Sequence, residues 1–205
     1  MRIGVFGGTF DPIHNGHLAL VDAALRHFGL DRVLLMPGHV TPFKQDSLVT
    51  PPEDRLAMAR LAAQGNPSLE VSTLELDRGG VSYTVDTLEA LHTERPGDEL
   101  WLLLGLDSLH DFGRWRRARD ILSLATVATL RRPGAALPEG NLPGLNAAET
   151  ALLRNNVADG DCPDISSSDI RRRIASGLPL NGLLPEAVSA YIRRRGLYGS
   201  APATP

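Results

Sequence analysis

Short apolar runs alternate with helical patterns along most of the chain, and this alternation restricts its fold more than any other feature. The runs that predict buried strands are residues 2–6, 32–37, 69–76, 99–105 and 124–130. Apolar residues recur at helical spacing over 15–28, 53–63 and 84–93, and residues 106–122 carry one or two helical turns. This order predicts a doubly wound, Rossmann-like α/β fold, in which helices cover both faces of a parallel sheet.

The pattern changes in the last third of the chain. Residues 134–163 are rich in Gly, Pro, Asn and Asp around one short helical pattern at 146–154, and two further short helical patterns follow without a convincing strand. We therefore expect an α/β domain over residues 1–163 and a small helical C-terminal subdomain over 164–199. The polar tail at 200–205 is expected to be disordered.

Composition narrows the class of protein. With 205 residues and a formal net charge of −3, the molecule is not built to coat nucleic acid or an anionic membrane. The single cysteine, Cys162, excludes an intrachain disulfide and a cysteine-based zinc site, and it fits a reducing compartment. No apolar run approaches the ~20 residues of a membrane span. We expect a cytoplasmic protein without nucleic-acid or membrane partners, and the composition leaves an oligomer open.

The first strand is followed by GGTFDPIHNGH, residues 7–17, at the position where open α/β sheets bind ligands. Gly7 and Gly8 permit close approach of an anion to the backbone, and the next helix begins with its partial positive charge at the same place. His14 and His17, about one turn apart, could donate hydrogen bonds to a phosphate. From these residues alone, two surface histidines or a zinc-binding pair without an evident third ligand remain alternatives.

Two familiar nucleotide-binding loops are excluded by inspection. The phosphate-binding loop G-x-x-x-x-G-K-[ST] needs a Gly-Lys pair, whereas the only lysine, Lys44, follows Phe43. The dinucleotide fingerprint G-x-G-x-x-G does not occur in the chain. The chain is therefore neither an ordinary P-loop enzyme nor an ordinary NAD-dependent dehydrogenase.

GGTFDPIHNGH closely resembles the G-G-x-F-D-P-x-H-x-G-H signature of the nucleotidyltransferase superfamily. The second hallmark of that superfamily, I-S-S-T-x-I-R, is matched by ISSSDIR at 165–171, where Ser168 keeps the hydroxyl of the usual threonine. Three further stretches are similar to one branch, the bacterial nicotinate-mononucleotide adenylyltransferases: GGVSYTVDTL at 79–88, GLDSLHDFGRW at 105–115 and LPEAVSAYIRRRGLY at 184–198. The chain departs from the branch at Phe43, where a histidine is common.

The resemblance implies that ATP and nicotinate mononucleotide react to give nicotinate adenine dinucleotide and pyrophosphate, a step of NAD synthesis. A phosphate monoester has a second pKa of about 6, so it is mostly ionised at neutral pH and needs no general base. Direct in-line attack on the α-phosphorus, without a covalent intermediate, is therefore expected. Mg²⁺ would be held mainly by ATP phosphates and water, because no carboxylate cage is evident in the sequence.

The resemblance also assigns residues, position by position. His14, His17 and Arg171 would be catalytic. The residues expected to bind ATP are Gly7, Gly8, Phe10, Gly105, Asp107, Ile165, Ser166 and Ser167, with Asp107 on a ribose hydroxyl and the two serines, together with Arg171, on the β- and γ-phosphates. Those expected to bind the mononucleotide are Thr9, Lys44, Tyr83, Thr84 and Trp115.

Several of these residues have simpler structural interpretations. Ser166 and Asp169 match a capping box that opens a helix, and Asp107 could cap the start of another. Trp115 could be a half-buried packing residue, and Lys44 could be an exposed loop lysine.

The predicted helix start at Thr84 leaves backbone N–H donors that suit a carboxylate but cannot satisfy an amide NH₂. The acid mononucleotide should therefore be preferred over the amide. Other transferases of the superfamily, acting on phosphopantetheine or with CTP, share the first and last motifs but not SYTVDT and the Trp115 region. A non-catalytic nucleotide sensor is the alternative from a different class.

Overall fold

The computed structural model describes residues 1–40, 50–131, 135–137, 139–160 and 162–199. Lys44 and the tail at 200–205 lie outside these ranges. The described strands are β1 (Arg2–Gly8), β2 (Arg32–Pro37), β3 (Leu69–Val71), β4 (Glu99–Gly105), β5 (Thr126–Arg131) and β6 (Val157–Asp159). The described helices are α1 (Asn15–Phe28), α2 (Pro52–Ala63), α3 (Leu74–Arg78), α4 (Thr84–Glu94), α5 (Leu106–Asp111), α6 (Ala118–Leu124), α7 (Ala147–Asn155), α8 (Ser167–Ala175) and α9 (Glu186–Arg195). Two short 3₁₀ helices, η1 (Phe112–Arg114) and η2 (Leu197–Gly199), complete the described elements.

The strands form one sheet in the order β3-β2-β1-β4-β5-β6, and every adjacent pair is parallel. The chain runs outward from β1 to β3, then returns to the other side of β1 and runs outward from β4 to β6. This order confirms the Rossmann-like fold and places the switch in direction between β1 and β4, where such sheets bind ligands.

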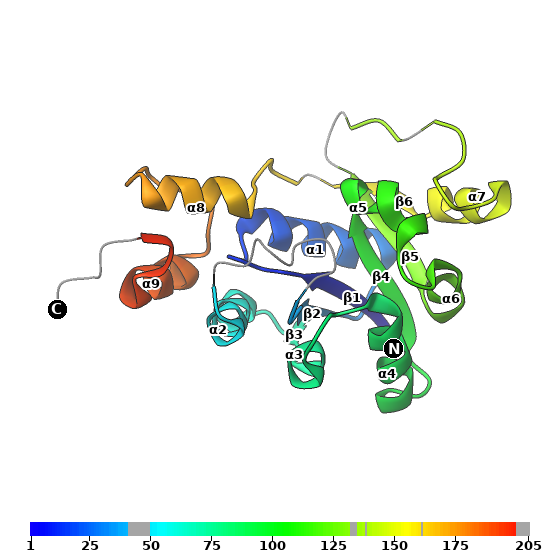
Figure 1. The fold of residues 1–205 in the computed structure, drawn as a ribbon, viewed down its shortest axis with the longest axis horizontal. Coiled ribbons are helices and arrows are strands. Elements are labelled where there is room, and N and C mark those ends of the chain that lie inside the picture. The colour runs from blue at the N-terminus through cyan, green and yellow to red at the C-terminus, as the bar shows by residue number, and fades with distance from the viewer. Residues whose placement is uncertain (41–49, 132–134, 138, 161, 200–205) are drawn as a thin grey trace.

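The alternating apolar side chains of the strands divide between two hydrophobic clusters, one on each face of the sheet. Phe6 and Leu103 belong to the cluster that α1, α2, α8 and α9 cover, whereas Val5 and Leu102 belong to the cluster that α4, α5, α6 and α7 cover. Figure 1 shows α8 and α9 together at one end of the molecule, near α1 and α2, and α6 and α7 at the other end. Both faces of the sheet are thus covered by helices, as the apolar pattern of the strands predicts.

The expected strand at 69–76 is wrong in its second half. Only Leu69–Val71 pairs with β2, and α3 begins at Leu74. Side chains in this stretch bond locally, because Ser72 Oγ accepts from the N–H of Leu74 at 3.3 Å and Thr73 Oγ1 donates to Asp77 at 2.6 Å. Such local bonds compete with a strand ladder, so the polar and apolar alternation does not decide the structure.

One other boundary differs from the expectation, and one described strand lies where no strand is expected. The helical turns expected within 106–122 are found as α5, η1 and the start of α6, but α6 continues to Leu124, so that β5 begins at Thr126 rather than at 124. β6 lies in a segment with no strand pattern, and its three residues form a strand only by pairing with Thr129–Arg131 of β5. Pairing with an existing strand can impose structure that a three-residue pattern cannot signal.

The C-terminal segment is helical, as expected, and forms a small subdomain of α8, α9 and η2. Ile170, Ile174, Val188 and Ile192 are buried in the same cluster as Val21 of α1. Among the described residues, no helix has both the length and the apolar character that crossing a lipid bilayer requires.

Candidate active site

A cavity of about 680 Å³ opens at the carboxyl ends of β1 and β4, where the strand order reverses. Its walls come from the turn after β1, the start of α1, the start of α5 and the start of α8. The assigned residues that line it are Gly7, Gly8, Thr9, Phe10, His14, His17, Gly105, Asp107, Trp115, Ile165, Ser166, Ser167 and Arg171. The fold therefore brings two motifs that are far apart in the sequence to one cavity.

His14 and His17 cap the start of α1 reciprocally. His14 is the N-cap residue, and its Nδ1 accepts from the N–H of His17 at 3.3 Å, while His17 Nδ1 accepts from the N–H of His14 at 3.2 Å. The two rings stack with centroids 3.6 Å apart and planes inclined by 18°. The arrangement is a capping box built from two imidazoles, in place of the usual Ser or Thr with Glu.

This reciprocal capping determines the chemistry of both rings. A nitrogen that accepts a backbone hydrogen bond carries no proton, so each neutral ring must hold its proton on Nε2. Both imidazoles line the cavity, and in this tautomer each is a hydrogen-bond donor through Nε2. Two donors beside the positive end of a helix form a site for an anion.

Aromatic packing and glycine hold the histidine pair. The ring of Phe10 is 2% exposed and meets the ring of His17 edge to face at 5.1 Å. A Cβ on Gly8 would lie 2.7 Å from the Phe10 ring, and a Cβ on Gly16 would lie 3.1 Å from His14 Nδ1. At Gly7, by contrast, no atom of the described residues beyond Gly7 and its two chain neighbours lies within 4 Å of the position that a Cβ would occupy, so the backbone there is open to an approaching group.

The turn that leads to His14 is held by side chains from distant parts of the chain. Arg55 of α2 donates to the Thr9 carbonyl at 2.8 Å, and Ser167 of α8 donates to the Pro12 carbonyl at 2.9 Å. Arg171, also on α8, donates to the Asp11 carbonyl at 2.7 Å. Three of the four carbonyls from Thr9 to Pro12 are thus fixed by helices that lie far from the turn in the sequence.

Of the two residues in the expected capping box of ISSSDIR, Ser166 caps the helix, whereas the Asp169 side chain bonds to arginines. Ser166 is the N-cap of α8, and its hydroxyl accepts from the N–H of Asp169 at 3.1 Å. The carboxylate of Asp169 pairs with Arg172 at 3.0 Å and with Arg173 at 2.7 Å, and these two pairs lower the pKa of Asp169. Ser166 thus caps a helix and lines the cavity at the same time.

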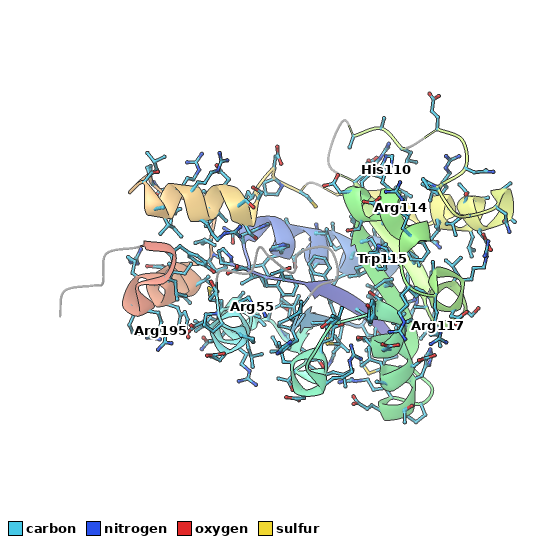
Figure 2. The ribbon with its side chains drawn as sticks, viewed as in Figure 1. Arg55, His110, Arg114, Trp115, Arg117 and Arg195 are labelled. Atoms are coloured by element: carbon cyan, nitrogen blue, oxygen red, sulfur yellow. The ribbon has the colours of Figure 1, made fainter. Side chains whose placement is uncertain are left out.

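Asp107 does not cap α5. The N-cap is Gly105, with no side-chain capping hydrogen bond, and Asp107 lies in the first turn with an exposed side chain at the cavity. The capping alternative for Asp107 is therefore wrong. Trp115, labelled in Figure 2, packs against the ring of Phe112 with centroids 5.5 Å apart, as its packing interpretation predicts. It also lines the cavity, and its binding of the mononucleotide stays a prediction.

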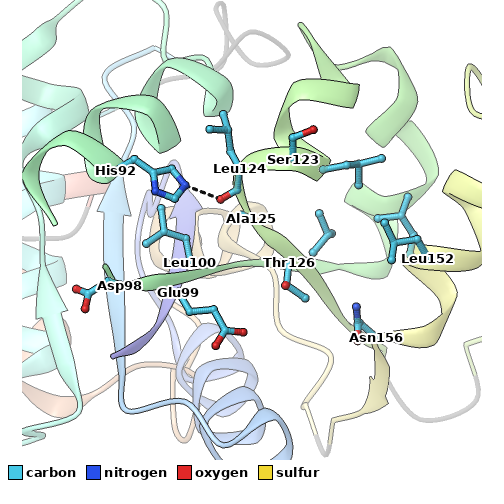
Figure 3. A pocket seen from close by; sticks show the side chains of 13 residues that line it. His92, Asp98, Glu99, Leu100, Ser123, Leu124, Ala125, Thr126, Leu152 and Asn156 are labelled. Atoms are coloured by element: carbon cyan, nitrogen blue, oxygen red, sulfur yellow. Dashed lines mark hydrogen bonds between the residues drawn. The ribbon is translucent and has the colours of Figure 1, made fainter. Parts of the chain in front are cut away.

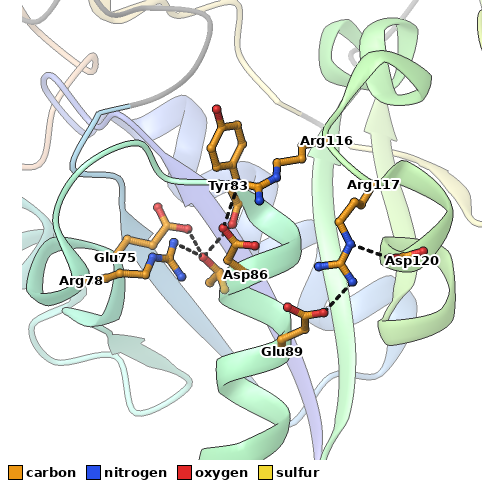
Figure 4. A network of polar contacts seen from close by, with 9 residues as sticks. Glu75, Arg78, Tyr83, Asp86, Glu89, Arg116, Arg117 and Asp120 are labelled. Atoms are coloured by element: carbon orange, nitrogen blue, oxygen red, sulfur yellow. Dashed lines mark hydrogen bonds and ion pairs between the residues drawn. The ribbon is translucent and has the colours of Figure 1, made fainter.

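Tyr83 and Thr84, which were assigned to the mononucleotide, are not among the described residues that line the cavity. α4 begins at Thr84, and no side chain caps it, as expected. The guanidinium of Arg116 lies 4.5 Å from the centroid of the Tyr83 ring and pairs with Asp86 at 3.5 Å (Figure 4). Because Arg116 follows Trp115 directly, this contact joins the start of α4 to the wall of the cavity.

The buried carboxyl group of Glu75 is hydrogen-bonded to the first turns of α4. Glu75 of α3 is 7% exposed and accepts from Thr87 Oγ1 at 2.7 Å, and Arg78 donates to the same Thr87 oxygen at 2.9 Å (Figure 4). Burial raises the pKa of Glu75, and the hydrogen bonds from Thr87 and Ser82 only partly oppose this.

Sequence reasoning missed Arg55, which is fully buried and which, among the described residues, donates to four backbone carbonyls. Besides Thr9, it donates to the carbonyls of Gly38 at 2.7 Å, His39 at 3.1 Å and Thr50 at 3.3 Å. Burial lowers the pKa of this guanidinium. Figure 2 shows Arg55 on α2, which packs against α9. An arginine within a helical pattern gives no sign of such a role, because three of these four partners, Thr9, Gly38 and His39, follow the ends of two strands.

The zinc alternative for the histidine pair receives no support from the described part of the chain, which holds no group of three or more His, Cys, Asp or Glu side chains suited to a metal ion. The carboxylates that line the cavity are those of Asp11, Asp107 and Asp111. Asp11 is buried, whereas Asp107 and Asp111 are exposed. Exposed carboxylates at this cavity fit the preference of Mg²⁺ for oxygen ligands.

A second, smaller cavity of about 280 Å³ lies at the opposite edge of the sheet, near the beginnings of β4 and β5 (Figure 3). Two of its polar side chains are engaged within the protein: His92 Nε2 lies 2.7 Å from the Leu124 carbonyl, and Asp98 pairs with the N-terminal amine at 2.8 Å. None of the assigned residues lines it. The candidate site is therefore the cavity at the switch point.

Comparisons with known proteins identify the family of the chain. A family model described as cytidylyltransferase-like matches residues 5–173. Relatives named "Probable nicotinate-nucleotide adenylyltransferase" from Roseiflexus sp. (strain RS-1) and Roseiflexus castenholzii are 47% and 46% identical over 197 residues, which is 96% of this chain and 97% and 98% of theirs.

Among solved structures, the nicotinic acid mononucleotide adenylyltransferase of Plasmodium falciparum complexed with NaAD superposes with a TM-score of 0.76. It is 18% identical and the match covers 97% of both chains, so this likeness shows the fold alone. The family follows from the sequence matches: this chain belongs to the cytidylyltransferase-like family and, within it, to the nicotinate-nucleotide adenylyltransferases.

Proposed function

We propose that the protein transfers the adenylyl group of ATP to nicotinate mononucleotide, releasing pyrophosphate and forming nicotinate adenine dinucleotide. The observation that carries the proposal is the reciprocal capping of His14 and His17 in the cavity at the switch point. It sets two Nε2–H donors beside the start of α1, which suits the charge that develops on a reacting phosphate. The relatives at 46–47% identity support the choice of substrates.

The attacking group is the phosphate of the mononucleotide, which is mostly ionised at neutral pH because its second pKa is about 6. It attacks the α-phosphorus of ATP directly and in line, and pyrophosphate leaves. His14 and His17 donate from Nε2 to the α-phosphate oxygens, and the positive end of α1 adds to this stabilisation. The protein contributes alignment and charge neutralisation, so no covalent intermediate is needed.

ATP lies over the open backbone at Gly7, with its β- and γ-phosphates at the start of α8. Ser166, Ser167 and Arg171 line the cavity there, and a helix N-terminus favours an anion. Asp107 accepts from a ribose hydroxyl, while Gly8, Phe10, Gly105 and Ile165 shape the wall. Mg²⁺ is held mainly by phosphate oxygens and water, with Asp107 and Asp111 as the exposed carboxylates nearby, and it neutralises phosphate charge when bound.

The mononucleotide occupies the side of the cavity nearer to Trp115, which stacks on the pyridine ring. Thr9 and Lys44 bind its phosphate; Lys44 is assigned from the sequence alone. The uncapped start of α4 at Tyr83 and Thr84 supplies N–H donors for the pyridine carboxylate. Because donors alone cannot satisfy an amide NH₂, the acid is preferred over the amide.

The test is pyrophosphate release with ATP and Mg²⁺, run in parallel with nicotinate mononucleotide, nicotinamide mononucleotide and phosphopantetheine. We expect fast release with the first acceptor and little with the others. Comparable kcat/KM values for the acid and the amide would contradict the carboxylate site. Release only with phosphopantetheine would contradict the choice of acceptor. Tight ATP binding without release for any acceptor would favour a nucleotide sensor.

His17→Ala tests the catalytic assignment. Loss of one preorganised donor should lower kcat by about 10²–10³-fold. The matched control is His27→Ala, which removes an exposed histidine from the far end of the same helix and should leave kcat unchanged. Equal rates for His17→Ala and His27→Ala would remove His17 from the mechanism.

A further inference from the structure

The C-terminal end of the described chain reaches back to the turn that precedes His14. The hydroxyl of Tyr198 donates to Asp11 Oδ1 at 2.6 Å, across 187 residues of sequence. Asp11 is 2% exposed, and its carbonyl accepts from Arg171. A buried carboxylate is costly without hydrogen bonds, so the phenol is an important partner of this side chain.

Tyr198 holds this position in an unusual backbone conformation. Its φ is 58°, in the left-handed region that residues with a side chain rarely adopt, and it directly precedes Gly199. Burial and the neighbouring Asp11 raise the pKa of the phenol, so it remains a donor throughout the working pH range. A strained residue whose hydroxyl meets a buried carboxylate is consistent with a constraint at a functional site.

The turn matters for the proposed catalysis because it leads directly to His14. Asp11 and Pro12 lie three and two positions before His14, whose backbone starts α1 and whose ring is fixed by His17. A displacement of about 1 Å in groups that contact the reacting phosphate can cost about 10²-fold in rate. Side chains that fix this turn can therefore change kcat without touching either substrate.

We propose that Tyr198 is a positioning residue for adenylyl transfer: its hydroxyl holds Asp11 and thereby sets the turn that places His14 and His17. The inference rests on the function proposed above and adds to it a requirement for the C-terminal segment. Tyr198 does not line the cavity, so its effect passes through Asp11 and not through contact with a nucleotide.

The chain contains a matched control for this bond. Tyr191, on α9 of the same C-terminal segment, donates to Asp54 Oδ1 at 2.7 Å, and Asp54 is 3% exposed. Arg195 also donates to Asp54, at 3.0 Å, so that carboxylate keeps a partner when the phenol is lost. Tyr191→Phe thus removes the same kind of bond from the same segment, at a carboxylate that lies outside the turn before His14.

The experiment compares Tyr198→Phe and Tyr191→Phe in the full chain, after wild-type release of pyrophosphate has been established. We expect Tyr198→Phe to lower kcat by about 10–10²-fold while the KM values for ATP and nicotinate mononucleotide change little. Tyr191→Phe should leave kcat unchanged. Unchanged kcat in Tyr198→Phe, or equal losses in both variants, would overturn the inference. An inactive wild type would instead overturn the proposed function.

A second readout does not depend on turnover. Nitrogen-15 spectra of the histidine rings should show both His14 and His17 protonated on Nε2 in the wild type and in Tyr191→Phe, with shifted His14 signals in Tyr198→Phe. Identical ring spectra in all three proteins would contradict the positioning role.

If Tyr198→Phe does not fold, Asp11→Ala removes the same bond from the other partner and should lower kcat at least as much, because Asp11 also lines the cavity. If both single variants fold, the double variant should lose no more kcat than the more impaired single variant, because the two residues act through one bond. Additive losses would contradict that coupling.

Discussion

At the scale of single residues, most of the candidate site follows from the sequence, because the residues of the two motifs converge on one cavity. What the sequence cannot show is how His14 and His17 fix each other's tautomer, since this depends on the exact start of α1. Arg55 and Tyr198 were missed for a related reason. Their partners, Thr9 and Asp11, lie far away in the chain, and no local pattern signals such a bond.

Gly7 offers a test at this scale. Apart from Gly7 and its two chain neighbours, no atom in the described part of the chain lies within 4 Å of the position that a Cβ would occupy, so Gly7→Ala should fold with unchanged stability. The added methyl group would occupy the space over which ATP lies in the proposed complex, and we expect a higher KM for ATP. Steady-state kinetics with a thermal melt as control checks this; an unchanged KM for ATP would place the nucleotide elsewhere in the cavity.

At the scale of elements, periodicity predicts the long strands and helices well because their apolar faces are buried against the sheet. It fails where polar side chains decide the structure, as at Ser72 and Thr73, and where a strand exists only through pairing, as in β6. The helix α3 that replaces the expected strand has a consequence for the site, because it buries Glu75 beneath the start of α4.

Glu75 should make stability depend on pH. Burial raises its pKa in the folded state above the ordinary value of 4.5, so the folded chain favours the protonated carboxyl. Its contribution to stability is fully present below that ordinary value and is lost as pH rises through the folded pKa.

Glu75→Gln lacks this titration and keeps an oxygen that can accept from Thr87. The free energy of unfolding of the variant, relative to the wild type, should therefore increase as pH rises from about 4 to about 8. Urea denaturation at several pH values measures the difference. A difference independent of pH would show that Glu75 titrates normally in the folded protein.

At the scale of the whole molecule, the composition and the strand–helix order predict the class of fold, and the structure adds how the C-terminal helices join it. We propose that residues 164–199 form a subdomain that depends on the α/β domain. Ile170, Ile174, Val188 and Ile192 share a hydrophobic cluster with α1, and Ser167 and Arg171 bond to the turn after β1.

A chain ending at residue 163 tests this dependence. It would expose the apolar surface that α8 and α9 cover, and we expect it to lack a cooperative thermal transition. The full-length protein, which should unfold in a single transition, is the control. A cooperative transition in the shortened chain near the full-length melting temperature would show that the α/β domain is independent.

The central claim is that one cavity aligns two nucleotides for a single displacement at the α-phosphorus. The most direct measurement is the stereochemical course of transfer from ATP carrying sulfur on its α-phosphorus, as one diastereomer, to nicotinate mononucleotide. Direct in-line attack predicts inversion of configuration in the dinucleotide product. Retention would require two displacements and therefore a covalent adenylyl–enzyme, which would contradict the roles assigned to His14 and His17.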